Sequence, residues 1–479
     1  MHMTSHNYTR TALFIDGQWV PAQGSGDIAV IDPSTECQVG HVPNGDAADV
    51  DAAVAAAQAA FDPDITVYER QHRLATIVAA LEKWLPHIAE TITTEMGAPV
   101  RVAQGPQTQV PLAVAHGFAE VLDAFTFEES VRNSLVVREP YGVVGAITPW
   151  NYPLYQVVAK VVPAIAAGCS VVLKPSNEAP LSVFEFIDAV HEAGLPPGVL
   201  NLVSGRGAVV GERLASHPDV DFVSFTGSTA VGGRVAELAA RSVKKVALEL
   251  GGKSANVILE GADLATAVKV GVGNAFLNSG QTCMAWTRML VPASRYTEAL
   301  KLITTAASKY SAGDPQDPST RIGPLASQSQ YDSVRGFIER AHRDGARLIV
   351  GGANKIGDVG YYVAPTVFAD VAPESELGQE EVFGPVLAVI PFKDEADALQ
   401  IANGTPYGLS GAVWAANTND GVAFARKIRT GQLDINGGAY NPLAPFGGYK
   451  RSGVGRELGR AGFEEYLQTK SLQLPQENS

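Results

Sequence analysis

The spacing of hydrophobic residues changes along this chain, and each spacing predicts a different kind of secondary structure. Residues 12–15 form a short apolar run with the length of a strand. In residues 51–61 and 70–95 apolar side chains recur at helical spacing, which predicts helices. From Val136 onward, short apolar runs alternate with helical stretches. The pattern therefore predicts a mainly helical beginning after short strands, followed by an α/β fold.

The first alternating series runs from Val136 to Leu250. Strands are predicted at residues 143–147, 171–173, 199–203, 220–225 and 245–250, and helices at residues 155–167, 182–193, 209–216 and 229–242. Strands that alternate with helices of this length form a parallel, doubly wound sheet, which binds ligands outside the carboxyl ends of its strands. Site residues are expected there.

A second series predicts a second α/β domain. Its strands are predicted at residues 288–291, 347–350, 386–390 and 410–414, and its helices at residues 296–310, 327–344, 395–402 and 421–428. No internal repeat or low-complexity linker separates the two series. The boundary near Gly251 and Gly252 is therefore expected to be a hinge.

Composition narrows the class of protein. With 36 Lys plus Arg against 50 Asp plus Glu, the net charge of −14 argues against nucleic acid or an anionic membrane as the main partner. Three cysteines do not make a disulfide framework and fit a reducing cytosol. Residues 1–10 are polar rather than signal-like, and Lys160 and Pro163 interrupt the apolar run at 157–173. We expect a soluble cytoplasmic protein.

Cys283 is the candidate nucleophile. Residues 278–283, Asn-Ser-Gly-Gln-Thr-Cys, close a helical stretch with a glycine and present the thiol in a polar, turn-prone setting. Cys37 and Cys169 lie in extended or apolar segments and are expected to be small buried hydrophobic residues.

Cys283 belongs to a set of motifs that resembles the aldehyde dehydrogenase superfamily. The set comprises residues 148–154 (TPWNYPL), 248–252 (LELGG), 278–283 (NSGQTC), 380–385 (EEVFGP) and 445–450 (PFGGYK). The resemblance covers nearly the whole chain. It implies a Rossmann-like dinucleotide-binding domain (residues 1–121 and 141–251), a catalytic α/β domain (252–450) and a β-arm (122–140 and 466–479). The arm implies a homo-oligomer, either a dimer or a tetramer.

A glycine-containing turn is the candidate pyrophosphate site. Residues 225–232 follow a strand and open a helix, whose N-terminus favours anions. Gly227 and Gly232 match only part of G-x-G-x-x-G, and a plain helix start capped by Ser228 gives the same local sequence. The family shares this departure from the full motif, so the resemblance implies cofactor binding here.

Other cofactor contacts follow from the resemblance. Lys174 is matched to a family lysine that binds the adenosine ribose, and Ser176 is assigned to the same part of the cofactor. A lysine at the end of a strand is, however, also commonly just a solvated side chain. Many NAD-preferring members have a glutamate where this chain has Asn177. An uncharged residue there removes a repulsion against a 2′-phosphate, so we expect NAD with NADP also accepted. The remaining matched positions are Trp150, Leu250, Glu381, which would hold the nicotinamide ribose, and Phe383.

The resemblance also assigns catalytic roles. Glu249 ends a strand before two glycines, which favour a site over an exposed strand end, and the family uses this glutamate as the base for hydrolysis. Asn151 is either a turn former or, as in the family, an oxyanion donor together with the backbone N–H of the nucleophile. Lys160 and Glu457 resemble a proton relay; otherwise they are a helix lysine and a surface acid.

These residues predict an NAD(P)-dependent, hydrolytic aldehyde dehydrogenase that acts through a thiohemiacetal and a thioester on Cys283. An acylating enzyme that uses coenzyme A is the alternative, although such members generally lack Glu249. A non-catalytic homologue would lack Cys283 or Glu249. No metal site is predicted. Positions matched to the aldehyde tunnel are mainly aromatic and include no arginine, which predicts an uncharged aliphatic or aromatic aldehyde; they are Tyr152, Tyr155, Gln156, Ala159, Met284, Trp286, Tyr440 and Phe446.

Overall fold

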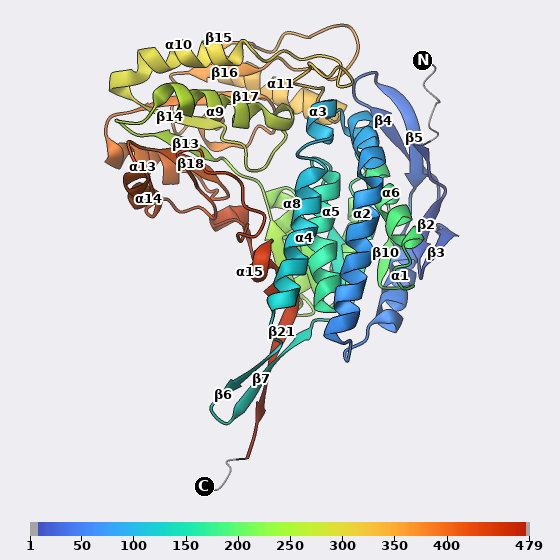
Figure 1. Ribbon diagram of the computed structural model, residues 1–479. Helices are drawn as coiled ribbons and strands as arrows, with labels where there is room; N and C mark the ends of the chain where they lie inside the picture. The colour runs from blue at the N-terminus through green and yellow to red at the C-terminus, as the bar shows by residue number, and fades with distance from the viewer. Residues whose placement is uncertain (1–7, 476–479) are drawn as a thin grey trace.

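The computed structural model describes residues 8–475, and Figure 1 shows their arrangement. Two large sheets with helices on both faces adjoin, and a narrow β-arm projects from the body that contains the N-terminal half of the chain. The predicted α/β class is confirmed. Residues 1–7 and 476–479, at the outer ends of the predicted first domain and arm, lie outside the described residues. Between residues 8 and 475, no helix is long and apolar enough to cross a membrane.

The first large sheet has eight strands in the order β20-β12-β11-β8-β9-β10-β2-β3. Its parallel centre consists of β8 (Val143–Ile147), β9 (Ser170–Lys174), β10 (Leu200–Leu202), β11 (Phe222–Thr226) and β12 (Lys245–Glu249). Antiparallel strands complete both edges, namely β2 (Ala12–Ile15), β3 (Gln18–Pro21) and β20 (Gly453–Val454). The predicted parallel strands are therefore present, with antiparallel additions at the edges.

Helices cover both faces of this sheet because successive strand side chains point to opposite sides. Val144 packs in a core with residues of α2, α4, α5 and α6, whereas Val143 packs in a core with residues of α1, α7 and α8. The helices are α1 (Ala47–Ala60), α2 (Val67–Met96), α3 (Val100–Ala103), α4 (Gln109–Ala124), α5 (Pro153–Ala167), α6 (Leu181–Glu192), α7 (Glu212–Ser216), α8 (Thr229–Ala240) and α15 (Gly459–Glu464).

The second large sheet has seven strands in the order β15-β16-β17-β14-β13-β18-β19, all parallel except the edge strand β15. The strands are β13 (Ala255–Ile258), β14 (Arg288–Pro292), β15 (Arg347–Val350), β16 (Thr366–Ala369), β17 (Val386–Phe392), β18 (Gly411–Trp414) and β19 (Asp434–Ile435). α9 (Leu264–Phe276) and α10 (Tyr296–Ala307) cover one face. The other face carries α11 (Gln328–Arg343), α12 (Glu376–Gln379), α13 (Glu395–Asn403) and α14 (Thr418–Ala425).

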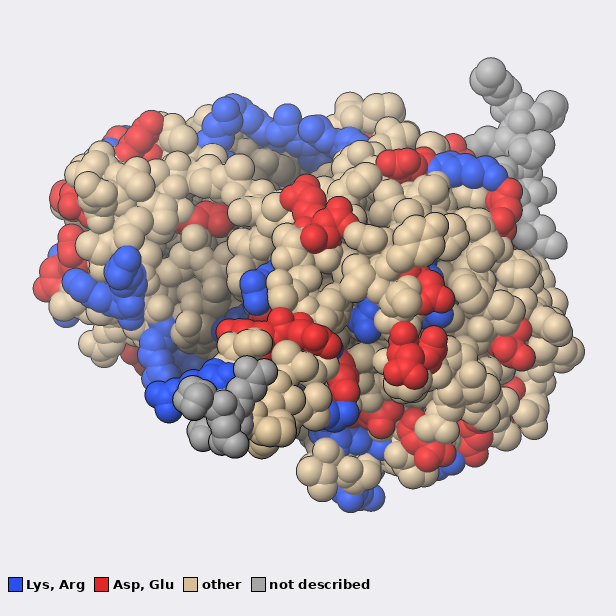
Figure 2. Space-filling model, turned by 60° about the horizontal axis from the view of Figure 1, so that its bottom comes forward, with Lys and Arg blue, Asp and Glu red and all other residues tan. Residues whose placement is uncertain are grey.

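Two small sheets complete the fold. β6 (Glu128–Val131), β7 (Ser134–Pro140) and β21 (Leu467–Gln473) form the arm, with β7 in the centre, and Figure 1 shows the arm extending away from the body. β1 (Tyr8–Thr9), β4 (Asp27–Asp32) and β5 (Cys37–Pro43) form the other sheet. On the face drawn in Figure 2, acidic and basic side chains are interspersed, and neither sign covers it continuously.

The structure corrects some local predictions. The helix expected at 421–428 spans 418–425 instead, and the one expected at 209–216 begins with a π-helical turn at Gly207–Gly211. Strands β13, β16 and β20 were not predicted. Cys37 is exposed rather than buried, because it begins the outer part of β5, whereas Cys169 is buried as expected.

Candidate active site

A cavity of about 280 Å³ lies where the carboxyl ends of the first sheet face the second α/β region. Segments that follow β8, β11 and β12 supply one wall, and Cys283 and residues around Glu381 supply the other. The lining residues are Pro149, Trp150, Asn151, Thr226, Gly227, Ser228, Leu250, Gly251, Cys283, Gln330, Ser333, Glu381, Val382 and Phe383. Motifs far apart in the sequence thus meet at one site. Gln330 and Ser333, on α11, carried no motif that would have identified them.

A strained turn presents Cys283. After α9 ends, Asn278 and Ser279 have φ values of 53° and 58°, which non-glycine residues seldom adopt. Gly280 also has a positive φ, and a side chain there would lie 2.1 Å from the carbonyl oxygen of Gly384. Asn278 Nδ2 donates to the carbonyl oxygen of Asn151 at 2.9 Å, which ties the turn to the opposite wall. Such strain persists only where surrounding contacts hold it.

Asn151 is fixed beside the thiol from both ends. Its Nδ2 donates to the carbonyl oxygen of Gln281 at 3.1 Å, and its own carbonyl oxygen accepts from Gln107 Nε2 at 2.8 Å. Gln107 is fully buried and had no motif to reveal it. The Asn151 amide is therefore an oriented donor next to Cys283 rather than a solvated turn residue.

The surroundings of Cys283 favour the neutral thiol. Burial raises its pKa most, and the charges of Glu381, Glu249 and Glu457 raise it further, while a hydrogen bond from the Met284 backbone opposes them. Activated cysteines commonly have lowered pKa values. A proton acceptor is therefore needed before this thiol becomes a nucleophile.

Glu249 is a buried carboxyl without a hydrogen-bond partner. It ends β12 with 4% of its surface exposed, and within the described chain neither carboxyl oxygen has a hydrogen-bond partner. Burial and then Glu457 raise its pKa, whereas Lys160 and Arg456 lower it. Gly447 approaches so closely that a side chain there would lie 2.8 Å from Oε1. Glu249 is therefore a buried carboxyl and not an exposed strand end.

Lys160 and Glu457 form a buried ion pair. Lys160, on α5, has no exposed surface, and Glu457 has 4%. Lys160 Nζ donates to Glu457 Oε1 and, at 2.7 Å, to Oγ1 of Thr226, which also lines the cavity. Thr226 pairs in the sheet with Glu249. The geometry thus links the cavity to the ion pair through a hydroxyl group that the sequence did not single out.

The second wall carries the Glu381 carboxylate and the ring of Phe383, which contacts Trp150 of the first wall. Glu381 Oε1 accepts from the backbone N–H of Gly252 at 3.0 Å. Burial raises the pKa of Glu381 to about 7, while Gly252 and Lys253 act in the opposite direction. Phe383 meets the ring of Trp150 edge to face at a centroid distance of 5.4 Å. These groups face the turn after β11 across the cavity.

The turn after β11 leads directly into α8. Ser228 caps α8 by accepting from the backbone N–H of Val231 at 3.4 Å. Gly227 lies in the cavity wall beside Leu250. At Gly232 a side chain would lie 2.4 Å from Leu250 Cδ2, so the missing side chain lets the helix pack closely on the end of β12.

Lys174 has an acidic neighbour, Glu178, that was not expected from the sequence. It ends β9 in a buried position, and Nζ donates to the carbonyl oxygen of Pro175 at 2.7 Å. Burial lowers its pKa to about 8, while the charge of Glu178 raises it. Glu178 also accepts from Ser176 Oγ, whereas Asn177 Oδ1 is buried and, in the described part of the chain, has no hydrogen-bond partner. Glu178 is thus the acid whose charge acts on Lys174, and sequence reasoning missed it.

Aromatic side chains surround the other side of the thiol. Tyr155 and Tyr440 share a hydroxyl–hydroxyl hydrogen bond of 3.1 Å, and Tyr152 OH and Thr282 Oγ1 share one of 3.0 Å. Cys283 packs against the same core as Tyr155, Met284 and Tyr440, and this core includes Ala159 and Phe446.

Gln156 and Trp286, which were also predicted to line the aldehyde tunnel, lie in different surroundings. Gln156 is buried on α5, and its Oε1 has no hydrogen-bond partner among residues 8–475. Trp286 is 2% exposed and packs in the core between the second sheet, α9 and α10, with Phe276 and Met289. The structure therefore does not place Trp286 with the aromatic residues around Cys283.

Known proteins resemble the chain along almost all of its length. A model of the aldehyde dehydrogenase family matches residues 19–472. The chain belongs to the aldehyde dehydrogenase family. It is 48% identical to 3-succinoylsemialdehyde-pyridine dehydrogenase of a Pseudomonas species, covering 96% of this chain and 97% of that protein. It is 42% identical to geranial dehydrogenase of Castellaniella defragrans, covering 96% and 98%.

Solved aldehyde dehydrogenases share the fold. A mutant of aldehyde dehydrogenase C from Pseudomonas syringae, in complex with NAD+ and octanal, has a TM-score of 0.95 and 44% identity, covering 97% of this chain and 96% of that one. The enzyme from Mycobacterium tuberculosis, in complex with NAD+, has a TM-score of 0.95 and 42% identity, covering 99% and 100%. The predicted family and fold are confirmed.

Proposed function

We propose that this aldehyde dehydrogenase oxidises an uncharged aldehyde to the carboxylic acid with NAD+, through an acyl intermediate on Cys283. The observation that carries the proposal is one cavity shared by Cys283, Asn151, Glu381 and the turn that opens α8. Glu249 lies close enough to influence the thiol pKa. Nucleophile, donor, base and anion site are the parts that the reaction requires.

The first step is assigned to the thiol and two donors. Because the pKa of Cys283 is raised, the thiol gives its proton to solvent water in the cavity as the sulfur adds to the aldehyde carbon. The side-chain amide of Asn151 and the backbone N–H of Cys283 are assigned to the resulting oxyanion. Removing one such donor costs about 2.7 to 4 kcal/mol, which is roughly a hundred- to a thousandfold in rate.

The cofactor is proposed to be NAD+, with measurable use of NADP+. The cavity fits its charged groups: α8 directs its N-terminus at one end, where the pyrophosphate would lie, and the Glu381 carboxylate faces the other, where the nicotinamide ribose would lie. Lys174, Ser176, Asn177 and Glu178 would meet the adenosine ribose. Bound NAD+ supplies the acceptor for the hydride that leaves the substrate. The NAD+ complexes of the similar enzymes support this choice.

The second step is assigned to Glu249. After oxidation the thioester carbonyl remains next to Cys283, and Glu249 takes a proton from the water that attacks it. The ion pair of Lys160 and Glu457 is proposed to accept that proton by way of Thr226. The presence of Glu249 supports release of a free acid, whereas transfer to coenzyme A needs no such base. Adding coenzyme A should leave the rate and the acid product unchanged.

The aromatic residues around the thiol support an uncharged substrate. The Tyr155–Tyr440 hydrogen bond uses one hydroxyl proton, which leaves the other to meet an acceptor on the aldehyde. No basic side chain belongs to this group, while Glu457 adds negative potential at both tyrosines. A carboxylate-bearing aldehyde would be repelled. The names of the relatives fit uncharged substrates, namely a pyridine semialdehyde and geranial.

Assembly, location and domain division are also proposals. The exposed edge strands of the arm, β6 and β21, offer an edge for a second copy, so we propose a homotetramer or a homodimer. The three sparse cysteines support a location in the cytoplasm. The change of sheet between Glu249 and Ala255 supports domains 1–121 with 141–251, and 252–450. Light scattering after size exclusion would measure the assembly.

The decisive experiment compares the wild type with Cys283→Ala. Reduced cofactor is followed by absorbance with octanal, a pyridine-bearing aldehyde and a carboxylate-bearing semialdehyde, each with and without coenzyme A. We expect turnover of the uncharged aldehydes by the wild type and none by Cys283→Ala, with an unchanged circular dichroism spectrum. Turnover by folded Cys283→Ala would refute the mechanism, and preference for the carboxylate would refute the substrate class.

A further inference from the structure

Lys253 is a buried cation that the proposed mechanism does not use. It follows Gly251 and Gly252 in the connection between the two large sheets, with 2% of its surface exposed. Within residues 8–475 its Nζ has no hydrogen-bond partner. Burying an unpaired ammonium group is costly, because water is lost and no acceptor replaces it. A lysine in such a place needs a reason beyond packing.

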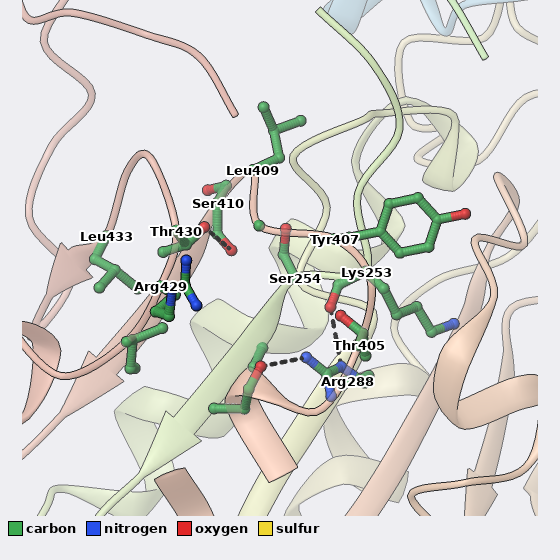
Figure 3. A pocket seen from close by; sticks show the side chains of 14 residues that line it. Lys253, Ser254, Arg288, Thr405, Tyr407, Leu409, Ser410, Arg429, Thr430 and Leu433 are labelled. Carbon is green, nitrogen blue, oxygen red and sulfur yellow. Dashed lines mark hydrogen bonds between the residues drawn. The ribbon is translucent and has the colours of Figure 1, made fainter. Parts of the chain in front are cut away.

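The surroundings of Lys253 show which acidic groups its charge acts on. Figure 3 shows its side chain running past Tyr407 and away from Ser410 and Arg429. The hydroxyl group of Tyr407 donates to Glu380 Oε2 at 3.3 Å, so this direction leads toward the acidic pair Glu380 and Glu381. Those two carboxylates are the acids whose charge acts on Lys253.

The basic group beside Lys253 is already satisfied. Arg288 donates to the carbonyl oxygens of Lys253, Ile401 and Ala402 at 2.9, 2.7 and 3.0 Å. Burial first, and then Arg288, lower the pKa of Lys253 to about 7, whereas Glu381 and Glu380 raise it. The ammonium form therefore depends on the nearby carboxylates for its stability.

The backbone fixes Glu381 on the same connection. Its Oε1 accepts from the Gly252 N–H, and a side chain at Gly251 would lie 2.2 Å from Oε2. The carboxylate thus rests on the two glycines that directly precede Lys253. A cation next in sequence favours the ionised form of this carboxyl, which otherwise becomes neutral on burial.

We propose that Lys253 is a positioning residue for the cofactor: its buried ammonium group keeps Glu381 ionised and oriented to accept the ribose hydroxyls. The inference rests on the proposed function, in which Glu381 holds the nicotinamide ribose. Lys253 itself does not touch the reacting atoms. It acts through Glu381, so its removal weakens NAD+ binding without removing a catalytic group.

The test is a double-mutant cycle with NAD+ affinity as the readout. Dissociation constants are measured by isothermal titration calorimetry for wild type, Lys253→Met, Glu381→Gln and the double variant. We expect Lys253→Met to raise Kd roughly tenfold, the scale of one charge-assisted contact. In the Glu381→Gln background, Lys253→Met should change Kd less than twofold, because the carboxylate that it supports is absent.

Stability separates this role from a structural one. Methionine fills a similar space without the buried charge, so Lys253→Met should have a melting temperature equal to or above that of the wild type. A loss of binding together with retained or increased stability is typical of a residue kept for function. Lys450→Met is the matched control: its Nζ donates to the carbonyl oxygens of Asn403 and Thr405, so NAD+ affinity should not change.

The outcomes are distinguishable. Failure of Lys253→Met to fold, an unchanged Kd, or independent effects of Lys253→Met and Glu381→Gln would overturn the positioning role. If the wild type itself does not bind NAD+, the proposed function fails. Unchanged binding in Glu381→Gln alone refutes the ribose contact, and with it this inference.

Discussion

Replacing Lys160 with methionine tests the buried ion pair beneath the active site. Methionine keeps much of the side-chain volume but leaves Glu457 buried without its cation. Glu457 Oε2 already has no hydrogen-bond partner among the described residues, so no second contact stabilises the charge. Removing one partner of a buried pair costs about 3 to 5 kcal/mol. At about 2.1 cal/mol/K of unfolding entropy per residue over 479 residues, 1 kcal/mol corresponds to roughly 1 °C, so the melting temperature should fall by roughly 3 to 5 °C.

The same substitution should move the pH dependence of hydrolysis. Lys160 lowers the pKa of Glu249, against burial and Glu457, which raise it. Without the ammonium group the pKa of Glu249 rises further, so at a given pH less of the base is ionised. The acid limb of the pH profile for thioester hydrolysis should therefore shift to higher pH. Rapid-mixing measurements of the acyl intermediate between pH 6 and 10 would show this shift.

A second variant and a surface control make the test specific. Lys160→Met combined with Glu457→Gln removes both charges and should recover most of the lost melting temperature. Lys83→Met breaks an ion pair whose partners are 64% and 52% exposed, and should change the melting temperature little. If Lys160→Met melts like the wild type, the ion pair does not stabilise the fold. If the acid limb of its pH profile stays in place, Lys160 does not lower the pKa of Glu249.

Three further predictions concern single residues around the cavity. Glu249→Gln should give a burst of reduced cofactor followed by slow turnover in rapid mixing, since the base acts after the thioester forms; slow reduction without a burst would assign it a different role. Asn177→Glu should shift kcat/KM toward NAD+ over NADP+ by roughly 1.5 to 3 kcal/mol, the scale of one charged contact; an unchanged ratio would place the discrimination elsewhere, with Glu178 as the next position to test. Gly251→Ala should raise Kd for NAD+ with little change in circular dichroism, because its Cβ displaces Glu381; unaltered affinity would show that the carboxylate need not occupy this position.

Local sequence predicted the elements whose signal is contained in their own residues. The strands of the first sheet's centre are fully buried, so they appear as continuous apolar runs, as at β8 and β9. β13 escaped prediction because it is short and includes Asn256, a buried polar residue that accepts from Trp414 Nε1 at 2.8 Å. β20 is two residues long and exists through pairing with a distant strand. Its formation depends on long-range contacts that periodicity does not report.

The residues of the candidate site also fall into two groups: those that the sequence indicated and those that only the structure revealed. Motifs indicated Cys283 and Glu249 as candidates because the chemistry of their own side chains suggests a role. Thr226, Glu178 and Lys253 have ordinary residue types for their positions, and only their contacts or their burial distinguish them. Residues that act through a neighbour are therefore the part of a site that a single sequence conceals.

The distance in sequence between Lys160 and Glu457 has a consequence for biosynthesis. The ribosome adds the acid 297 residues after the lysine, which takes roughly 15 to 60 s at 5 to 20 residues per second. From the synthesis of β12 until that of β20, β12 is an uncovered edge, because β20 follows every strand of the second sheet in the sequence. An open edge strand invites pairing with other chains. A nascent chain of this protein therefore completes its first sheet only near the end of translation, and truncation before Gly453 should yield aggregates rather than a folded first sheet with its helices.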